Sequence, residues 1–484
     1  MLLLQEPLLL LLFIGSKMHN IAAFAALAGC LFSASIASPT PVQDADEVER
    51  RGLLRSLGGV LGNVIDPINK ILDGKTDSKD PYGDVLKIMK PVTATTRPSD
   101  TEQAHATISS VFAASPTPKN IIDAAARLVA QGLTADNVES ALDFIGGVLE
   151  GENSEYNVNL KNPTPAAFPK AGPSDAPYSL SEVALRAVIH IPDSFQYGKA
   201  GAPQPIILVP GTGNTGYITF SGNMIPLIQE SKVADPVWLN IPGYLLNDAQ
   251  VNAEYVAYAI NYIYGISNQR QVAVGAWSQG NIDSQWAYKY WPSTRDRVTD
   301  HLGFSPDYHG TVLANVIEIP GEPLPPSVLQ QEYNAKFITT LRNKGGDSSY
   351  VPTTNIFSAT DEVVQPQFGD NASGSLLDAR GAGASNNEVQ VVCKGELAGS
   401  LYTHEGVLYN PLSFALLKDA LAHNGTGQPS RLDLQSVCND YLTPELDLAD
   451  FLLTENSILV AGLAILTYPD KVTEEPPIKP YAAA

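Results

Sequence analysis

The sequence predicts an α/β protein with a mostly parallel central sheet that helices cover on both faces. Two observations support this class. Short apolar runs recur after residue 200, as is typical of strands buried on both faces, and segments with helical periodicity separate them. The chain of 484 residues is 44% hydrophobic and 17% charged, so it has ample material for a large core.

The expected elements follow one another as alternating strands and helices. The predicted strands are residues 206–209, 237–241, 271–274, 300–304 and 355–357. The predicted helices between them are residues 251–264, 281–290 and 327–344. Residues 161–484 are therefore predicted to form the main domain.

The N-terminus reads as a secretory signal peptide over residues 1–37. An apolar run at 21–32 precedes Ser35-Ile36-Ala37, a small-x-small cleavage pattern. A second leucine-rich stretch lies upstream of Met18, which is explained most simply if translation starts at Met18. Residues 38–51 resemble a propeptide that ends in the dibasic pair Arg50-Arg51, although such a pair also arises by chance. We expect a secreted, extracellular protein.

Residues 52–160 carry helical signals and are predicted to form an N-terminal helical extension. Asn120 caps a run that reaches Val129 and stops at Gly132, and Thr134 opens a second helix to about residue 149. The stretch around residues 75–101 is rich in Pro, Thr and Asp, and we expect it to be mobile.

Charge and hydropathy exclude several partners. Lys and Arg total 30 against 51 Asp and Glu, and the net charge of −21 repels nucleic acid and anionic membrane surfaces. Beyond the signal peptide, the longest apolar run, residues 458–466, is short of a bilayer span, so we expect no transmembrane segment. The sequence does not indicate an oligomeric state.

Cysteines and sequons fit an oxidising compartment. Of three cysteines, Cys30 leaves with the signal peptide, and the remaining Cys393 and Cys438 are predicted to form one disulfide, the alternative being two free thiols. Asn371 and Asn424 begin glycosylation sequons, either of which can remain unused. We find no cluster of metal ligands.

The candidate nucleophile is Ser278. A strand leads into Gly275-Ala276-Trp277-Ser278-Gln279-Gly280, and a helix follows, which is the context of a nucleophile elbow. Ala276 takes the first glycine position of G-x-S-x-G. The pattern alone is weak, but the strand before it and the helix after it strengthen it.

A serine nucleophile needs a base and a carboxylate, in the order Ser, Asp or Glu, His for this type of fold. Asp361 follows a predicted strand, and only His404 and His423 lie beyond it. His423 adjoins a sequon and is expected at the surface, so we assign the base to His404. The competing interpretation is a structural histidine.

Donors for an oxyanion are expected after the first strand of the main domain. The turn 210–216 is rich in glycine and contains Thr212, whose backbone N–H and hydroxyl are candidate donors. A phosphate-binding loop is the alternative, but no Lys follows as that motif requires.

Several long blocks resemble the Candida antarctica lipase B-like family of fungal secreted α/β-hydrolase lipases. The similarity runs from about residue 162 to the C-terminus and is carried by residues 208–213, 246–252, 277–280, 304–313 and 351–367. It implies an α/β-hydrolase fold and triacylglycerol lipase or general esterase activity, without a cofactor. The partner is then a lipid or another ester, met at an oil–water interface.

The resemblance also implies a role for each matching position. Ser278, Asp361 and His404 become nucleophile, acid and base. The oxyanion hole is formed by Thr212, through its backbone and hydroxyl, and by the backbone N–H of Gln279. The remaining implied site residues are Trp277 as the floor of the alcohol pocket and Asp307 with Gln331 as a polar pair beside the acyl channel.

The sequence departs from the family pattern in three places. Thr403 stands before the base where the family has Asp, and Val237 replaces a cysteine, so that only the Cys393–Cys438 disulfide remains. The extension 52–160 has no counterpart in the pattern. Two other functions stay open: an esterase or cutin-type polyester hydrolase with the same triad, and a catalytically silent lipid-binding protein on this fold.

Overall fold

A seven-stranded sheet organises the protein, for which a computed structural model describes residues 61–113, 117–314 and 322–483. The strand order is β1-β3-β2-β4-β5-β6-β7, and every neighbouring pair is parallel except β1 with β3. The strands are β1 Ile189–His190, β2 Gln204–Val209, β3 Ala234–Leu239, β4 Val272–Trp277, β5 Val298–Phe304, β6 Thr353–Phe357 and β7 Ala384–Glu388. The predicted α/β class is confirmed.

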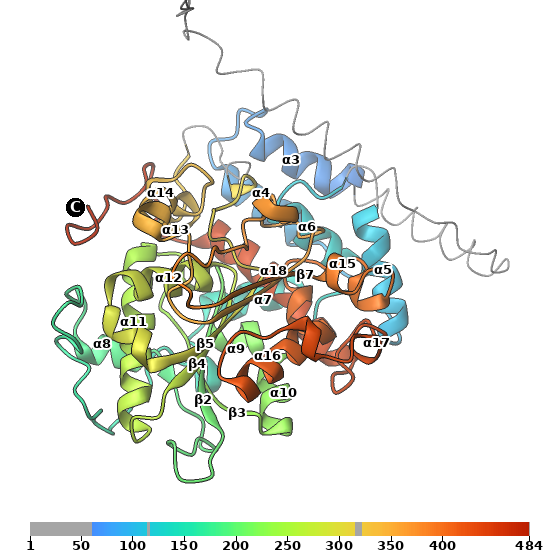
Figure 1. Cartoon of the computed structure of the whole chain (residues 1–484). Coiled ribbons are helices and arrows are strands. Elements are labelled where there is room, and N and C mark those ends of the chain that lie inside the picture. The colour runs from blue at the N-terminus through green and yellow to red at the C-terminus, as the bar shows by residue number, and fades with distance from the viewer. Residues whose placement is uncertain (1–60, 114–116, 315–321, 484) are drawn as a thin grey trace, which may run out of the picture. The chain divides into compact units, whose positions relative to one another are not determined.

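Helices cover both faces of this sheet. Figure 1 shows α8, α11 and α12 on one side of the strands and α9, α10 and α16 on the other. The helices after residue 160 are α8 Glu182–Ala187, α9 Gly216–Phe220, α10 Met224–Ser231, α11 Ala249–Ile266, α12 Gln279–Tyr290, α13 Pro326–Gln330, α14 Lys336–Arg342, α15 Val389–Val392, α16 Pro411–His423, α17 Leu434–Val437 and α18 Leu448–Thr467. Short 3-10 turns are η3 Pro292–Arg297, η5 Asn343–Gly345, η6 Gly369–Asn371, η7 Leu397–Gly399, η8 Gly406–Tyr409 and η9 Pro429–Arg431.

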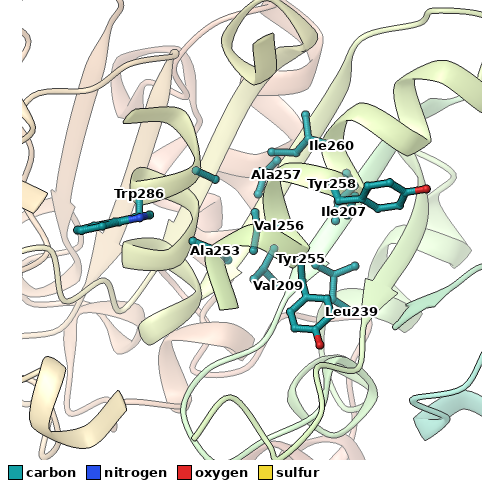
Figure 2. Packing of buried hydrophobic residues seen from close by; sticks show 14 of the residues in the cluster. Ile207, Val209, Leu239, Ala253, Tyr255, Val256, Ala257, Tyr258, Ile260 and Trp286 are labelled. Carbon is teal, nitrogen blue, oxygen red and sulfur yellow. The ribbon is translucent and has the colours of Figure 1, made fainter. Parts of the chain in front are cut away.

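The core lies between the sheet and its helices. On one face, Ala253, Val256 and Ile260 of α11 are fully buried and pack toward Ile207 and Val209 of β2 (Figure 2). The strands β2 to β6 are buried along almost their whole length, which explains the apolar sequences of β2 and β4. β5 and β6 also bury polar side chains, such as His301 and Asn355. This rigid frame fixes the carboxyl ends of the strands, where the candidate site lies.

The five predicted strands are present, but the two edge strands were not predicted. β7 has the sequence Ala-Ser-Asn-Asn-Glu, which has no apolar alternation. Its Asn387 side chain donates to the Asn355 carbonyl of β6, so polar contacts replace apolar packing at this edge. β1 has only two residues, too few for any periodic pattern.

The single helix predicted over 327–344 is wrong, because two helices, α13 and α14, replace it. Between them the backbone pairs with Thr311 instead of continuing the helix: Thr311 N–H donates to Gln331 C=O, and Tyr333 N–H donates to Thr311 C=O. The break leaves Gln331 just after α13, at the candidate site.

The N-terminal region is helical, as predicted, but its details differ. It contains η1 Leu61–Ile65, α3 Asp66–Leu72, α4 Pro81–Met89, α5 Thr101–Ala113, α6 Ile121–Ala130, α7 Val138–Gly146 and η2 Gly151–Asn153. Asn120 caps α6 through its side chain, as expected. The second predicted helix corresponds to α7, which is capped by Asn137 and not by Thr134. The Thr134 hydroxyl instead donates to the Asp136 carbonyl. The stretch expected to be mobile contains α4.

These N-terminal helices pack on α18, as Figure 1 shows for α6 and α7. At the closest approach, a Cβ on Gly462 of α18 would lie 3.2 Å from Ile122 Cδ1 of α6. Residues 56–484 form one compact unit. The predicted signal peptide and propeptide lie outside the described residues.

α18 is longer than the apolar run of residues 458–466 that the sequence analysis identified. Its 20 residues have a mean hydropathy of 1.6, so by length and composition alone it could cross a bilayer. The expectation that the chain has no transmembrane segment stays a prediction. The apolar run seen in the sequence begins only at Ile458, because the polar residues Thr454-Glu455-Asn456-Ser457 precede it. In the structure, 72% of its apolar window is buried within the protein, as in a core helix.

Cys393 and Cys438 form the predicted disulfide. It follows α15 and α17 and closes a segment of the chain that contains His404. Both sequon asparagines, Asn371 and Asn424, are exposed. Their glycosylation stays a prediction.

Candidate active site

Ser278 lies at a strained turn between β4 and α12. Its backbone has φ 53° and ψ −130°, a conformation that non-glycine residues rarely adopt and that marks a nucleophile elbow. The turn is crowded. A Cβ on Gly280 would lie 2.5 Å from the Pro210 carbonyl oxygen, and one on Gly211 would lie 2.8 Å from Ser278 Cβ. Small residues are therefore required around the serine.

His404 and Asp361, far apart in the sequence, lie side by side. His404 Nδ1 is 2.7 Å from Asp361 Oδ2, and because the carboxylate accepts, Nδ1 carries the hydrogen. Asp361 follows β6, and its other oxygen accepts from the backbone N–H groups of Val363 at 2.9 Å and Val364 at 2.7 Å. The aspartate is thus fixed before it orients the imidazole.

The carbonyl of His404 is also held. It accepts from Ser305 Oγ at 2.7 Å and from Trp277 Nε1 at 3.2 Å. The Trp277 ring lies with its centroid 4.9 Å from that of the imidazole. Trp277 is therefore in contact with the histidine, and it also lines the cavity above Ser278.

The electrostatics of His404 favour protonation. Burial of the imidazole opposes its charge, but the carboxylates of Asp361, Glu362 and Asp307 outweigh burial and raise the pKa of His404 above 6.5. Its Nε2 has no hydrogen-bond partner among the described residues, although Ser278 lines the same cavity. Catalytic hydrogen bonds are often loose before substrate binds.

Thr212 lines the cavity over Ser278, and Gln279 follows Ser278 in the chain as the first residue of α12. Gln279 begins α12, so its backbone N–H has no carbonyl partner one turn earlier in the helix. Thr212 Oγ1 lies 2.8 Å from Gln279 Oε1 and 3.0 Å from Gln331 Oε1, and its single hydrogen serves only one of them at a time. The hydroxyl points to the glutamine pair, so it must rotate to reach an oxyanion.

Asp307 and Gln331 do not form the expected polar pair by hydrogen bonding. Gln331 Nε2 donates to Gln279 Oε1 and to the Ser327 carbonyl, each at 3.0 Å. Both carboxylate oxygens of Asp307 are buried without a hydrogen-bond partner among the described residues. Gln331 lines the cavity, whereas Asp307 acts on the site through the charge that it places near His404.

A narrow apolar cavity of about 50 Å³ lies over Ser278. Ser278 is 4% exposed and His404 is 1% exposed, so the candidate site is nearly closed. Its walls include Thr311, Leu313 and Ala314, Val328 of α13 and Gln331 after it, and residues of two helices that the sequence did not connect with the site. These two contribute Asn120 and Ile121 at the start of α6 and Ile458, Ala461 and Ile465 of α18. Asn120 was identified only as a helix cap, and nothing local in the sequence marks α18 as a pocket wall.

Buried carboxyl groups surround the site. Burial raises the pKa of Asp307, Glu362 and Glu455 to about 7 each. It raises the pKa of Asp283 and Glu405 well above the ordinary range, with added repulsion from neighbouring carboxylates. All five bind a proton more tightly in the folded chain than in the unfolded one.

We therefore expect the protein to be more stable at acidic than at alkaline pH. The contribution of Asp307, Glu362 and Glu455 is complete below their unfolded pKa values of 3.8 or 4.5 and is lost as pH rises through about 7. His301 and His309 oppose the trend, because burial lowers their pKa to about 3 and about 4. The carboxyl groups outnumber them, so Tm measured by calorimetry should fall from about pH 5.5 to about pH 8. A Tm that is flat or rises over this range contradicts the prediction, and Asp307→Asn should reduce the slope.

The known proteins that are similar to this chain include two lipases. Lipase B of Pseudozyma antarctica is 39% identical over 286 residues, which cover 58% of this chain and 79% of that protein. The crystal structure of Aspergillus fumigatus lipase B has a TM-score of 0.77 and 44% identity, and the match covers 86% of this chain and 99% of that one. No family model matches.

These matches place the seven-stranded architecture in the α/β-hydrolase fold. Residues 161–484 make up only two thirds of the chain, so the match of 86% with the Aspergillus structure extends into the N-terminal helical region. The extension that lacked a counterpart in the sequence pattern therefore has one, at least in part, in that relative.

Proposed function

The chain belongs to the lipase B family of ester-hydrolysing serine hydrolases, and we propose that it is a triacylglycerol lipase that works through a Ser278–His404–Asp361 triad. The observation that carries the proposal is the 2.7 Å contact between His404 Nδ1 and Asp361, because His404 lines the same cavity as the strained Ser278. The family membership supports ester hydrolysis, and the triad is our assignment.

In this mechanism, Ser278 Oγ attacks the carbonyl carbon of the ester while His404 Nε2 takes its proton. Asp361 holds the imidazole in the tautomer that leaves Nε2 free and stabilises the imidazolium that forms. His404 then gives the proton to the leaving alcohol, and water repeats the sequence on the acyl-enzyme. The backbone N–H groups of Thr212 and Gln279, together with the Thr212 hydroxyl once it has rotated, stabilise the oxyanion.

The cavity and the relatives support the proposed substrate class, triacylglycerols. The cavity walls are mostly apolar, as a fatty acyl chain requires, and both named relatives are lipases. Initial rates on triacylglycerols of different chain lengths, below and above their solubility limit, test the proposal. Rates that are high only on short soluble esters favour an esterase, rates on cutin favour a polyester hydrolase, and no hydrolysis of any ester leaves a lipid-binding protein.

Thr212→Val is expected to lower kcat by about 10²–10³-fold with little change in KM, because the variant loses a donor to the oxyanion but keeps the side-chain shape. In the free protein the hydroxyl bonds to the glutamine pair, and Gln279 Oε1 keeps its second donor, Gln331 Nε2, in the variant. The fold should therefore survive. An unchanged kcat in a folded variant indicates that backbone donors suffice, and a fall confined to KM assigns Thr212 to binding.

We also propose that the chain is secreted, with a signal peptide at residues 1–37, a propeptide at 38–51 and glycans on Asn371 and Asn424. The cysteine pair and the two exposed sequons support this compartment. N-terminal sequencing of the mature protein and its mass before and after glycosidase treatment test the proposal.

The hydrolase domain, residues 161–484, is proposed to fold without the extension 52–160. A shortened chain that begins near residue 160 loses the packing of α6 and α7 on α18 and exposes the apolar surface around Gly462, which lowers its stability. We expect this chain to fold with a lower Tm than the full chain. A shortened chain that is insoluble or unfolded by circular dichroism shows instead that the extension is an integral part of the fold.

A further inference from the structure

One carboxyl group of α18 holds the loop that carries His404. This histidine loop comprises residues 403–406, and all of it is buried. Glu455 Oε1 accepts from Thr403 Oγ1 at 3.2 Å, and Thr403 Oγ1 in turn accepts from Gly406 N–H at 2.9 Å. Tyr409, at the end of η8, donates to the same Glu455 oxygen at 2.8 Å. Glu455 therefore accepts hydrogen bonds from residues on both sides of His404 in the sequence.

The position of Gly406 shows how tightly this arrangement is built. A Cβ at Gly406 would lie 2.7 Å from Thr403 Oγ1 and 2.8 Å from the Tyr409 hydroxyl. The two donors to Glu455 thus enclose the backbone just after the histidine. A shift of either donor moves the loop.

Glu455 is paired with the residue that follows the histidine. The carboxyl groups of Glu405 and Glu455 interact directly and are placed to form a hydrogen bond if one of them is protonated, and both side chains are fully buried. Two ionised carboxylates have no hydrogen to share, so the bond requires one proton between them. Glu455 accepts from two hydroxyls, which favours its charged form, whereas no side-chain donor reaches Glu405. The proton therefore belongs on Glu405.

We propose that Glu455 is a positioning residue for His404 and acts through a proton-sharing pair with Glu405. The proposal rests on the assigned role of His404 in ester hydrolysis. While Glu405 is protonated, the pair attaches the histidine loop to α18, the helix that also supplies Ile458, Ala461 and Ile465 to the cavity wall. Loss of the proton leaves two buried carboxylates side by side, which repel each other and loosen the loop.

The groups around the pair favour retention of the proton. Carboxylates approach it from the segment after β6, and a backbone contact, His404 N–H to Glu362 Oε2 at 2.9 Å, brings one of them against the histidine loop. Tyr441 lies against Tyr409, with 3.1 Å between their hydroxyl oxygens, and the His105 ring of α5 stacks on Tyr441 at 3.8 Å between centroids. The titratable groups facing the pair or its histidine are Glu362, Asp361, Asp307, His404, Tyr409, Tyr441 and His105.

The test compares kcat and KM on a soluble p-nitrophenyl ester across the pH range for several variants. Glu455→Ala should lower kcat by about 10²-fold with KM nearly unchanged, because a small displacement of a catalytic base costs about that much. Glu455→Gln should restore most of the loss, since its oxygen still accepts from Thr403 and Tyr409. In the unchanged protein, kcat should fall at alkaline pH, when the pair loses its proton and the loop loosens. Glu405→Gln should keep kcat at acidic pH and should not show this alkaline fall, because the amide of the new side chain donates a hydrogen bond without titrating.

Glu254→Gln is the matched control. Glu254 of α11 is also fully buried and accepts from Ser179, but it lies outside the cavity wall. It should lower Tm without moving the pH profile. The positioning role is overturned if Glu455→Ala folds and keeps kcat, or if Glu405→Gln retains the alkaline fall at the same pH.

A second readout separates this inference from the proposed function. Titration of the His404 ring by NMR should show a second inflection when the pair loses its proton, and Glu405→Gln should lack it. This signal does not depend on activity. If the unchanged protein shows no second inflection, the Glu405–Glu455 pair is overturned. If it shows the inflection but hydrolyses no ester, only the catalytic assignment is contradicted.

Discussion

Replacement of Ser278 by alanine is expected to reduce kcat for ester hydrolysis by about 10⁵–10⁶-fold, because no other group on this turn can form the acyl-enzyme. The backbone donors of the oxyanion hole remain, so a small residual rate over water should persist. Ester hydrolysis measured with purified protein checks the prediction, and a circular dichroism spectrum equal to that of the unchanged protein shows that the fold is intact.

Ser284→Ala is the matched control for this variant. Ser284 is also a fully buried serine of α12, but its hydroxyl donates to the Gly280 carbonyl within the helix. It should leave kcat near its original value. A Ser278→Ala protein that hydrolyses esters at the original rate places the nucleophile elsewhere.

Asp361→Asn should lower kcat by about 10⁴-fold without disturbing the fold. The asparagine oxygen can still accept from the backbone of Val363 and Val364, so the loop keeps its anchors. Its NH₂ group, however, donates to His404 Nδ1 and forces the hydrogen onto Nε2. The imidazole is then in the tautomer that cannot take the serine proton.

The same variant should lower the pKa of His404. Asp361 contributes both charge and a hydrogen bond that raise this pKa, and without them the opposing effect of burial prevails. NMR titration of the imidazole measures the change directly. Asp235→Asn, at a buried aspartate of β3 that accepts from Gln196 N–H, should leave both kcat and the histidine unchanged. A full rate in Asp361→Asn contradicts the assigned triad.

The central strands could be predicted from the sequence because burial on both faces favours short runs that are mostly apolar. β7 could not, because its Ser and Asn side chains satisfy polar groups at the edge of the sheet, where no apolar pattern is needed. The break between α13 and α14 was also beyond reach. It depends on backbone pairing with Thr311, a contact between segments that are distant in sequence.

The candidate site likewise has residues that the sequence predicts and residues that only the tertiary structure reveals. Ser278 and Asp361 could be predicted because each follows a predicted strand, and His404 could be predicted from the chain order that the chemistry requires. The hydrogen-bond partners of Gln331 and the cavity wall formed by α6 and α18 depend on tertiary packing alone. Glu455 was missed for a related reason: in the sequence it is a single charge at the start of an apolar run, and only the fold brings it to Glu405.

The most direct test of the triad is the site of covalent modification by a fluorophosphonate, mapped by mass spectrometry on the full chain. An activated serine adds to the phosphorus with loss of fluoride, whereas an ordinary hydroxyl does not react. The assignment of Ser278 as the nucleophile predicts one adduct per chain, on the peptide that contains Ser278, and none in Ser278→Ala or, at the same exposure time, in Asp361→Asn. An adduct on another residue, or labelling that persists in Ser278→Ala, contradicts it.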